Sequence, residues 1–260
     1  MTARTIRLGG AEVCRIGLGT NRLRDTKENV AFIRAAVDAG VQMIDTAHLY
    51  MKGESEKTLG HALSPVPPGV IVATKGGHYG YGSPGTPEVL RREIEQSLAS
   101  LHVKRIKLYY LHRVDPETPI EESLGAIKEY VDRGVIESVG ISEVDIPMIE
   151  RARKAVPIAA VQNHYNIDER KWDDVVGYCE REGIVFLPYY PLHVESSRAL
   201  AETAKRHEAT TRQVMLAWLL ARSPAMLPIP GTLSLEHLRE NLGALSIELT
   251  RAECEELAGG

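Results

Sequence analysis

Short apolar runs alternate along this chain with longer segments in which apolar residues recur three and four positions apart. Uninterrupted apolar runs are typical of strands buried on both faces, whereas the longer spacing gives a helix one apolar face. Eight runs fit such strands: Ile16–Leu18, Met43–Asp45, Val70–Thr74, Ile106–Leu111, Ser138–Ile141, Ala159–Gln162, Ile184–Pro188 and Met226–Ile229. The helical pattern is clear at Asn29–Ala39, Glu88–Leu101, Ile120–Asp132 and Trp172–Glu182. The alternation predicts an α/β fold built on a parallel sheet.

The ends of the helical segments carry signals of their own. Three segments stop at a glycine that can take a left-handed conformation, and a strand follows at once: Gly40, Gly134 and Gly183. Thr86-Pro87 and Thr118-Pro119 each offer a capping hydroxyl followed by proline at the first helical position. Glu121 would complete a capping box with Thr118.

Eight strands with intervening helices and no break in composition predict a closed (β/α)8 TIM barrel, with residues 1–260 as a single domain. Thr5–Leu8 and Glu12–Arg15 flank Gly9-Gly10, which predicts an N-terminal β-hairpin that plugs the bottom of the barrel. One crossover is irregular, because two helical segments, Arg198–His207 and Arg212–Arg222, share it. A doubly wound open sheet is the alternative, but no GxGxxG turn follows an early strand.

Charge and cysteine content disfavour several classes of protein. The net charge is −4 and the 31 basic residues are spread along the chain, so we expect no nucleic-acid partner. The three cysteines form no CxxC pair, and the histidines lack HExxH spacing, so we expect reduced thiols and no metal site. The first ten residues lack an apolar core, and the longest apolar stretch, Val214–Ala221, is too short to span a bilayer. We therefore expect a cytoplasmic protein without membrane contact, as a monomer or weak oligomer.

Polar residues stand at three consecutive strand ends, where barrel enzymes carry their catalytic groups. Asp45 ends the second strand with Tyr50 five residues on, Lys75 ends the third, and His112 ends the fourth. A phenol is a weak acid at neutral pH, and a nearby ammonium lowers its pKa, while a carboxylate keeps that ammonium charged. Each residue alone also fits a structural role, such as a capped turn, a loop aromatic, a surface lysine or a core histidine. Their joint occurrence favours a proton-donating site.

Several motifs resemble those of the aldo-keto reductase superfamily. They are Met43-Ile44-Asp45-Thr46-Ala47-His48-Leu49-Tyr50 with Gly53-Glu54-Ser55-Glu56, Val72-Ala73-Thr74-Lys75 and Leu108-Tyr109-Tyr110-Leu111-His112. The resemblance runs from Gly17 to Asn241. It implies reduction of an aldehyde or ketone by hydride transfer from NADPH, with NADH as the alternative cofactor. It also implies Tyr50 as general acid, Lys75 and Asp45 as the pair that tunes it, and His112 as the group that orients the carbonyl.

The resemblance extends to residues that would bind the cofactor. It implies that Ser142 and Gln162 hold the nicotinamide carboxamide and that Tyr189 stacks on the nicotinamide ring. The other implied cofactor residues are Gly19, Thr20, Pro191, Leu192, Gly231, Thr232, His237, Glu240 and Asn241. Leu235–Ala244 is expected to be a short helix whose N-terminus attracts an anion, which supports a phosphate site after the last strand.

The chain departs from the family pattern at three places. Glu143 stands where an asparagine usually follows the serine, which puts an anion near the carboxamide. Gly231 and His237 replace the lysine and arginine that many relatives use to bind the 2′-phosphate, so this segment predicts only a moderate preference for NADPH over NADH. The chain ends at Gly260, so we expect the C-terminal loop over the substrate pocket to be mostly absent.

These motifs leave the identity of the small-molecule carbonyl substrate open. Candidates to line its pocket are His78, Tyr79, Tyr81, Arg113 and His193. An alternative is an NAD(P)H-binding regulatory or sensor protein with vestigial turnover, as in the β subunits of potassium channels that the family includes. A third hypothesis shares only the barrel: an aldolase or sugar-phosphate isomerase with Lys75 as a Schiff-base lysine.

Overall fold

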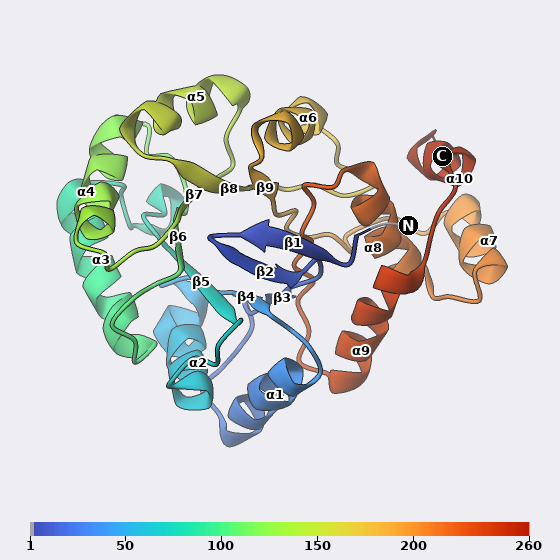
Figure 1. The fold of residues 1–260 in the computed structure, drawn as a ribbon, viewed down its shortest axis with the longest axis horizontal. Coiled ribbons are helices and arrows are strands. Elements are labelled where there is room, and N and C mark those ends of the chain that lie inside the picture. Colours follow the sequence, from blue (N-terminus) through green and yellow to red (C-terminus); the bar gives the residue numbers. More distant parts are fainter. Residues whose placement is uncertain (1–2, 260) are drawn as a thin grey trace.

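The computed structural model describes residues 3–259 and has helices arranged around a curled parallel sheet (Figure 1). Seven strands pair in chain order, β3-β4-β5-β6-β7-β8-β9. Their bounds are Leu18–Gly19, Met43–Asp45, Ile71–Gly76, Leu108–Leu111, Val139–Ser142, Ile158–Gln162 and Val185–Phe186. Every pairing in this sheet is parallel, which confirms the predicted α/β class and gives a barrel-like arrangement.

The helices form the outer layer. They are α1 Lys27–Asp38, α2 Glu54–Leu63, α3 Pro87–Ser100, α4 Ile120–Asp132, α5 Ile146–Ala155, α6 Asp173–Glu182, α7 Arg198–Arg206, α8 Thr211–Arg222, α9 Leu235–Gly243 and α10 Arg251–Gly259, with short 3-10 turns η1 Tyr50–Gly53, η2 Tyr79–Tyr81 and η3 Ala244–Ser246. Figure 1 shows α7 and α10 outside α8. Within residues 3–259, none of the helices is both long and apolar enough to cross a membrane.

The segment after α8 lies between the two edges of the sheet. Leu227 N donates to the Phe186 carbonyl at 2.9 Å, and Gly17 N donates to the Pro228 carbonyl at 2.9 Å. Parallel bridges join Phe186 to Met226 on one side and Gly19 to Gly231 on the other. The predicted eighth strand, Met226–Ile229, is therefore present as an extended segment but not as a regular strand. Pro228 and Pro230 lack the backbone N–H that a continuous ladder requires.

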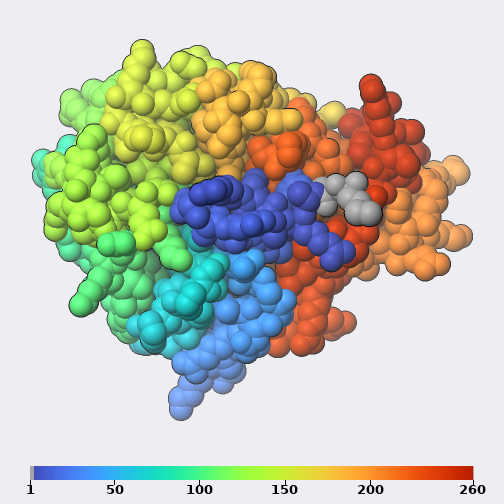
Figure 2. All heavy atoms as spheres, viewed as in Figure 1, coloured from blue at the N-terminus to red at the C-terminus, as the bar shows by residue number. Residues whose placement is uncertain are grey.

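The predicted N-terminal hairpin is confirmed. β1 Thr5–Leu8 pairs antiparallel with β2 Ala11–Cys14, and Gly9 and Gly10 both take positive φ in the turn. The hairpin lies across the middle of the face seen in Figures 1 and 2. Its buried Leu8 and Val13 belong to the cluster of side chains inside the curled sheet. The hairpin thus covers the end of the fold opposite the carboxyl ends of the strands.

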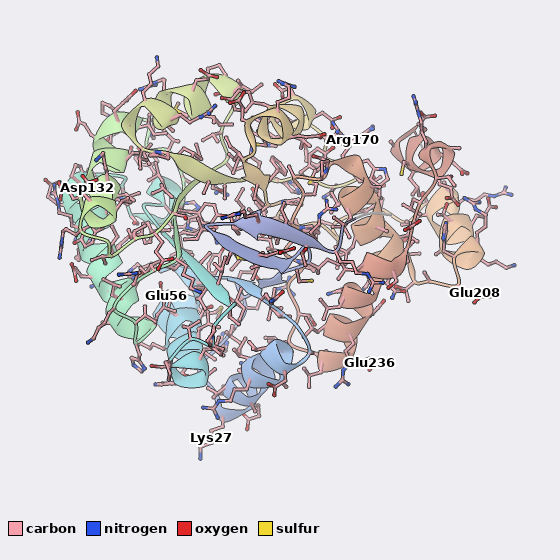
Figure 3. All side chains as sticks on the ribbon, in the orientation of Figure 1. Lys27, Glu56, Asp132, Arg170, Glu208 and Glu236 are labelled. Carbon is pink, nitrogen blue, oxygen red and sulfur yellow. The ribbon has the colours of Figure 1, made fainter. Side chains whose placement is uncertain are left out.

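The charged side chains are mostly on the outside, with one exception that bears on the site. Figure 3 shows Lys27, Asp132 and Glu236 at the periphery, whereas Glu56 points inward from α2. Glu56 is fully buried and accepts a 2.6 Å hydrogen bond from the Thr74 hydroxyl on β5. This contact fixes α2 against the strand that carries Lys75.

The predicted capping box at Thr118 is wrong. The N-cap of α4 is Pro119, and the Thr118 hydroxyl instead donates to Asp115 Oδ2 at 3.0 Å. Glu121 pairs with Arg151 of α5 at 2.7 Å, so its carboxylate does not turn back to the helix start. Because the helix begins one residue later than expected, Thr118 precedes the cap position, and its hydroxyl serves the loop by donating to the Asp115 carboxylate.

Candidate active site

Asp45, Lys75, Tyr50 and His112 come together at the carboxyl ends of β4, β5 and β6. The ammonium of Lys75 lies 2.6 Å from Asp45 Oδ1, 2.7 Å from the Thr46 carbonyl and 3.4 Å from the Tyr50 hydroxyl. The ring centroids of Tyr50 and His112 are 5.7 Å apart, edge to face. The four residues therefore form one contact network.

A tight turn after β4 brings Tyr50 back over the strand ends. Tyr50 N donates to the Ala47 carbonyl, and Met51 and Lys52 take left-handed φ of 49° and 58° before α2 begins. A buried hydroxyl of Ser55 anchors the turn, because it lies 2.7 Å from the Thr46 hydroxyl and 2.9 Å from the Thr20 hydroxyl. These hydrogen bonds connect the loop after β3 to the turn that carries Tyr50.

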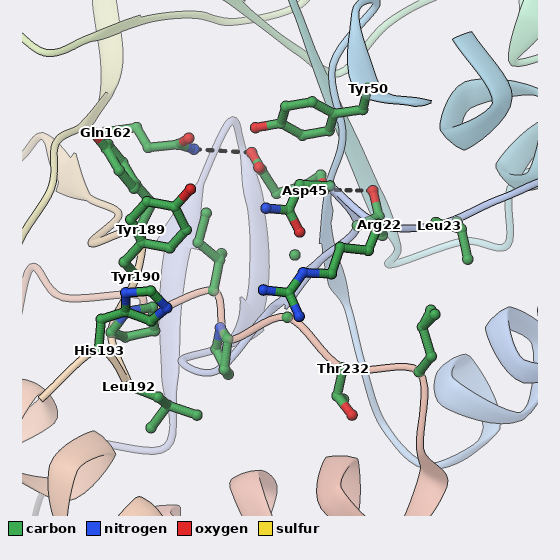
Figure 4. A pocket seen from close by; sticks show the side chains of 18 of the residues that line it. Arg22, Leu23, Asp45, Tyr50, Gln162, Tyr189, Tyr190, Leu192, His193 and Thr232 are labelled. Carbon is green, nitrogen blue, oxygen red and sulfur yellow. Dashed lines mark hydrogen bonds between the residues drawn. The ribbon is translucent and has the colours of Figure 1, made fainter. Parts of the chain in front are cut away.

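The Lys75 side chain is charged although it is fully buried. Burial acts to lower the pKa of Lys75, but the attraction of Asp45 and Tyr50 outweighs it, so the pKa is raised above its ordinary value. Asp45 is held in turn by Gln162, whose amide donates to Asp45 Oδ2 at 2.9 Å (Figure 4). The ion pair thus has both carboxylate oxygens satisfied, as a buried charge requires.

The net shift at Tyr50 is opposite to the one expected from the sequence. Burial raises the pKa of Tyr50 above its ordinary value, and this effect exceeds the lowering caused by the charge of Lys75. The sequence suggests the lowering by the Lys75 ammonium, but it does not show how much water the folded chain removes from the phenol, and this loss of water raises the pKa. Tyr50 is therefore a neutral phenol at neutral pH, and its proton is available for donation.

His112 is buried beside Tyr50 as a neutral imidazole. Burial, followed by the charges of Lys75, His78 and Arg113, lowers the pKa of His112 well below its ordinary value. Among residues 3–259, no group forms a hydrogen bond with its buried Nδ1 atom. The ring of His78 packs edge to face against the ring of His112, with 4.6 Å between the ring centroids. A neutral imidazole has one N–H group, which can donate a hydrogen bond to a carbonyl oxygen, and it carries no positive charge.

Tyr50 and His112 line a cavity of about 840 Å³. Figure 4 shows Tyr50 at the wall of this cavity. The cavity is lined by most of the cofactor residues expected from the sequence: Gly19, Thr20, Gln162, Tyr189, Pro191, Leu192, Gly231, Thr232, His237 and Asn241. Lys75, Ser142 and Glu240 do not line it. Lys75 is covered by its partners, and the Glu240 carboxylate accepts a 2.6 Å hydrogen bond from the Thr210 hydroxyl at the start of α8.

Arg113 connects three of the expected site residues. Its Nη1 atom donates to the His112 carbonyl at 2.7 Å and to the Ser142 hydroxyl at 2.8 Å, and its Nη2 atom donates to the Tyr189 hydroxyl at 3.3 Å. The Ser142 hydroxyl itself donates to the Gln162 carbonyl at 2.7 Å. The sequence identified Arg113 only as a candidate to line the substrate pocket, because these contacts join residues far apart in the chain.

Glu143 is not free to enter the cavity. It takes a left-handed φ of 56°, a conformation in which asparagine is more common than glutamate, and its carboxylate accepts a 2.6 Å hydrogen bond from His164 N. Burial, with a further contribution from Glu143, raises the pKa of Tyr189 above its ordinary value. The carboxylate thus lies against the backbone at His164 and beside Tyr189, and Glu143 is not among the residues that line the cavity.

The charge of the cavity wall is positive. Within the described part of the chain, three arginines line the cavity, Arg22, Arg113 and Arg212, and the only carboxylate in the lining is Asp45, which is paired with Lys75. Figure 4 shows the Arg22 side chain extending into the cavity between Asp45 and Thr232. Arg22 and Arg212 are not among the residues that the sequence motifs identify. Arg22 follows Gly19-Thr20 closely enough to have been suspected, whereas nothing local distinguishes Arg212.

The substrate candidates divide into two groups. His78, Tyr81, Arg113 and His193 line the cavity, whereas the Tyr79 hydroxyl lies 3.4 Å from Glu117 outside it. Tyr81 is 76% exposed and contacts the His78 ring edge-on at 4.7 Å. Residues 3–259 contain no cluster of three or more histidine, cysteine, aspartate or glutamate side chains that could hold a metal ion.

The chain is similar to known proteins over most of its length. The family model described as aldo/keto reductase family matches residues 15–194 and 190–259. An uncharacterized oxidoreductase of Schizosaccharomyces pombe is 38% identical, over 95% of this chain and 87% of its own length. Pyridoxine 4-dehydrogenase of Escherichia coli is 31% identical, over 100% of this chain and 99% of its own.

Solved structures agree with the sequence matches. A thermostable aldo-keto reductase in complex with the inhibitor epalrestat superposes with a TM-score of 0.91 at 33% identity, over 98% of both chains. An aldo-keto reductase from Klebsiella pneumoniae in complex with NADPH gives a TM-score of 0.89 at 27% identity, over 99% of this chain and 94% of that one. The chain therefore belongs to the aldo/keto reductase family.

Proposed function

We propose that this protein is an NADPH-dependent oxidoreductase that reduces aldehydes or ketones to alcohols, with Tyr50 as the proton donor. One observation carries the proposal: the Tyr50 hydroxyl lies 3.4 Å from a buried, charged Lys75 and beside the neutral His112, at the wall of a large cavity. Membership of the family supports the reaction. The Klebsiella pneumoniae relative bound to NADPH supports the cofactor.

The scaffold for this reaction is a closed (β/α)8 barrel formed by residues 1–260 as one domain. The hydrogen bonds of the 225–231 segment to both β9 and β3 support closure. Closure would bring the carboxyl ends of all eight strands to one mouth, where the cavity opens.

The volume of the cavity, about 840 Å³, and the positive charge of its wall suit a dinucleotide. Its positive wall favours a ligand with several phosphates, and Arg22 reaches the part between the catalytic residues and Thr232. Gln162 would hold the carboxamide together with Ser142, whose hydroxyl would turn from Arg113 and the Gln162 carbonyl toward the cavity. Tyr189 would stack on the nicotinamide ring, and Gly19, Thr20, Pro191 and Leu192 would line its path. Gly231, Thr232, His237 and Asn241 would surround the adenosine phosphate, and Glu240 would hold α9 against α8 through Thr210.

The protein residues supply binding, orientation and a proton. When bound, the reduced nicotinamide supplies the hydride that the carbonyl carbon accepts. His112 donates a hydrogen bond that orients the carbonyl oxygen, and Tyr50 transfers its hydroxyl proton to that oxygen, so that the carbonyl becomes an alcohol. The Tyr50 phenolate left behind is stabilised by the ammonium of Lys75 until a proton from solvent restores it. Because the ammonium is buried, its effect on the developing charge is stronger than it would be in water.

The geometry disfavours the two alternatives. A Schiff-base lysine must attack as a neutral amine, but Lys75 is charged and bonded to Asp45 at 2.6 Å. A sensor without turnover has no need for a proton donor in contact with a buried ammonium, and here that contact is retained. Neither alternative has a feature of the site that favours it over reduction.

A fluorescence titration with NADPH and NADH, followed by turnover of 4-nitrobenzaldehyde, tests the proposal. Tyr50→Phe should bind NADPH as the wild type does but reduce the aldehyde about 10²–10⁴ times more slowly, because general acid catalysis contributes that much. Tyr190→Phe is the matched control, since Tyr190 lines the same cavity without contacting Lys75, and its rate should change little. Unchanged turnover in Tyr50→Phe would remove Tyr50 from its role, and tight binding without turnover on any aldehyde would support the sensor.

A further inference from the structure

Arg212 is an unpaired cation in the wall of the cavity. It is the second residue of α8, its side chain is exposed, and it lines the cavity together with His237 and Asn241 of α9. Within residues 3–259, Arg212 has no hydrogen bond, ion pair or ring contact. Several other arginines of the outer helices are paired: Arg91 with Glu129, Arg151 with Glu121 and Arg198 with Glu202. Arg212 is thus available to a ligand.

Glu240 of α9 does not form an ion pair with Arg212. Glu240 of α9 lies close to the start of α8, but its carboxylate accepts the 2.6 Å hydrogen bond of Thr210. The Gln213 amide donates to the Glu240 carbonyl at 3.0 Å, so the start of α8 is tied to the middle of α9. Thr210 and Gln213, which make these two bonds, stand on either side of Arg212 in the sequence. They hold the backbone of Arg212 at the edge of the cavity, while its side chain stays free.

Within the described part of the chain, the segment after the last extended segment contributes no permanent cation to this end of the cavity. Its lining after the last extended segment is Gly231, Thr232, Leu233, His237 and Asn241, none of which carries a guanidinium or ammonium. Arg239 lies on α9 but does not line the cavity. A phosphate monoester dianion bound beside α9 would therefore have Arg212 of α8 as a permanent positive partner, with Arg22 on the side of the cavity nearer Asp45. Arginine suits it, because the planar guanidinium stays charged and binds phosphate oxygens in a bidentate manner.

We propose that Arg212 binds the 2′-phosphate of NADPH and so gives this protein its preference for NADPH over NADH. The proposal rests on the proposed function, since it takes the 231–241 segment as the adenosine end of the cofactor site. In this proposal, a residue of α8 binds the 2′-phosphate, because the 231–237 segment has Gly231 and His237 where many relatives have a lysine and an arginine. Arg212 is a specificity residue far from the reacting atoms, so its loss should change cofactor affinity and leave the chemistry intact.

The test compares the dissociation constants of NADPH, NADH, 2′,5′-ADP and 5′-AMP for the wild type and Arg212→Ala, by fluorescence or calorimetry. We expect Arg212→Ala to weaken NADPH and 2′,5′-ADP about tenfold or more, and NADH and 5′-AMP less than about twofold. Arg239→Ala removes the same charge from a nearby exposed site outside the cavity, and it should leave all four constants nearly unchanged. Arg212→Lys should recover part of the loss, because it restores the charge but not the bidentate geometry.

The outcomes separate this proposal from the proposed function. Equal weakening of NADPH and NADH in Arg212→Ala, or no weakening of either, would overturn the role of Arg212 while the protein remains a nucleotide-dependent reductase. A preference for NADPH that disappears as the pH rises from about 7 to about 9 would assign the 2′-phosphate to an imidazole instead, because a guanidinium stays charged over that range. Failure of the wild type to bind either nucleotide would overturn the proposed function itself.

Discussion

Replacing Lys75 by methionine should destabilise the protein strongly, because the substitution leaves a buried carboxylate without its cation. The side chains of Lys75 and Asp45 are 0% and 3% exposed, and their charged atoms are 2.6 Å apart. Removing one partner of a buried ion pair costs about 3–5 kcal/mol. The Gln162 amide still donates to Asp45 Oδ2, so we expect a loss near the lower end of that range, about 3 kcal/mol in the free energy of unfolding.

Urea unfolding followed by circular dichroism measures this loss, and a double substitution isolates the pair. Lys75→Met with Asp45→Asn should lose less than the sum of the two single variants, with a coupling free energy of about 2 kcal/mol. Lys128→Met is the matched control, since its 2.7 Å pair with Asp132 has side chains 44% and 62% exposed. That control should change stability by less than about 1 kcal/mol. Equal losses in Lys75→Met and Lys128→Met would refute the argument that burial makes the Lys75 pair different.

Two further predictions concern stability. Burial lowers the pKa of His112 in the folded protein, so the stability that its neutral form contributes is present above the ordinary histidine pKa of about 6.5 and is lost as the pH falls below it. The urea midpoint of the wild type should therefore drop more between about pH 7 and pH 5 than that of His112→Asn. Parallel drops in the two proteins would contradict this account. Gly140→Ala should cost about 1–3 kcal/mol, because the new Cβ atom would lie 2.2 Å from the Tyr110 ring, whereas Gly125→Ala in α4 meets nothing within 4 Å and should be neutral or slightly stabilising in the same unfolding assay.

The sequence is informative about this fold where the signal is local. Apolar runs and glycine stops identify the strands and many of the helices, because periodicity and left-handed glycines depend on near neighbours. It is less informative about the exact helix start and about the regularity of a strand. The capping hydroxyl of Thr118 is taken by Asp115, and the last sheet segment is irregular because its two prolines lack ladder donors.

In the candidate site, too, some features follow from the sequence and others do not. Asp45, Lys75 and His112 stand at strand ends, so their convergence follows from the parallel sheet alone. The direction of the Tyr50 pKa shift does not, because it depends on how much water the folded chain excludes from the phenol. The contacts of Arg113 and the position of Arg212 beside α9 join segments far apart in the chain, and no short-range pattern predicts them.

The most direct test of the central claim is the fate of the hydride. Incubation of the protein with 4-nitrobenzaldehyde and NADPH deuterated at both C4 positions of the nicotinamide, followed by mass spectrometry of the product, reports whether hydride passes from cofactor to carbonyl. We predict an alcohol that carries a single deuterium on its carbinol carbon, formed far more slowly by Tyr50→Phe. An alcohol without deuterium, or no alcohol from any reactive aldehyde despite bound NADPH, would contradict the assignment of this site to carbonyl reduction.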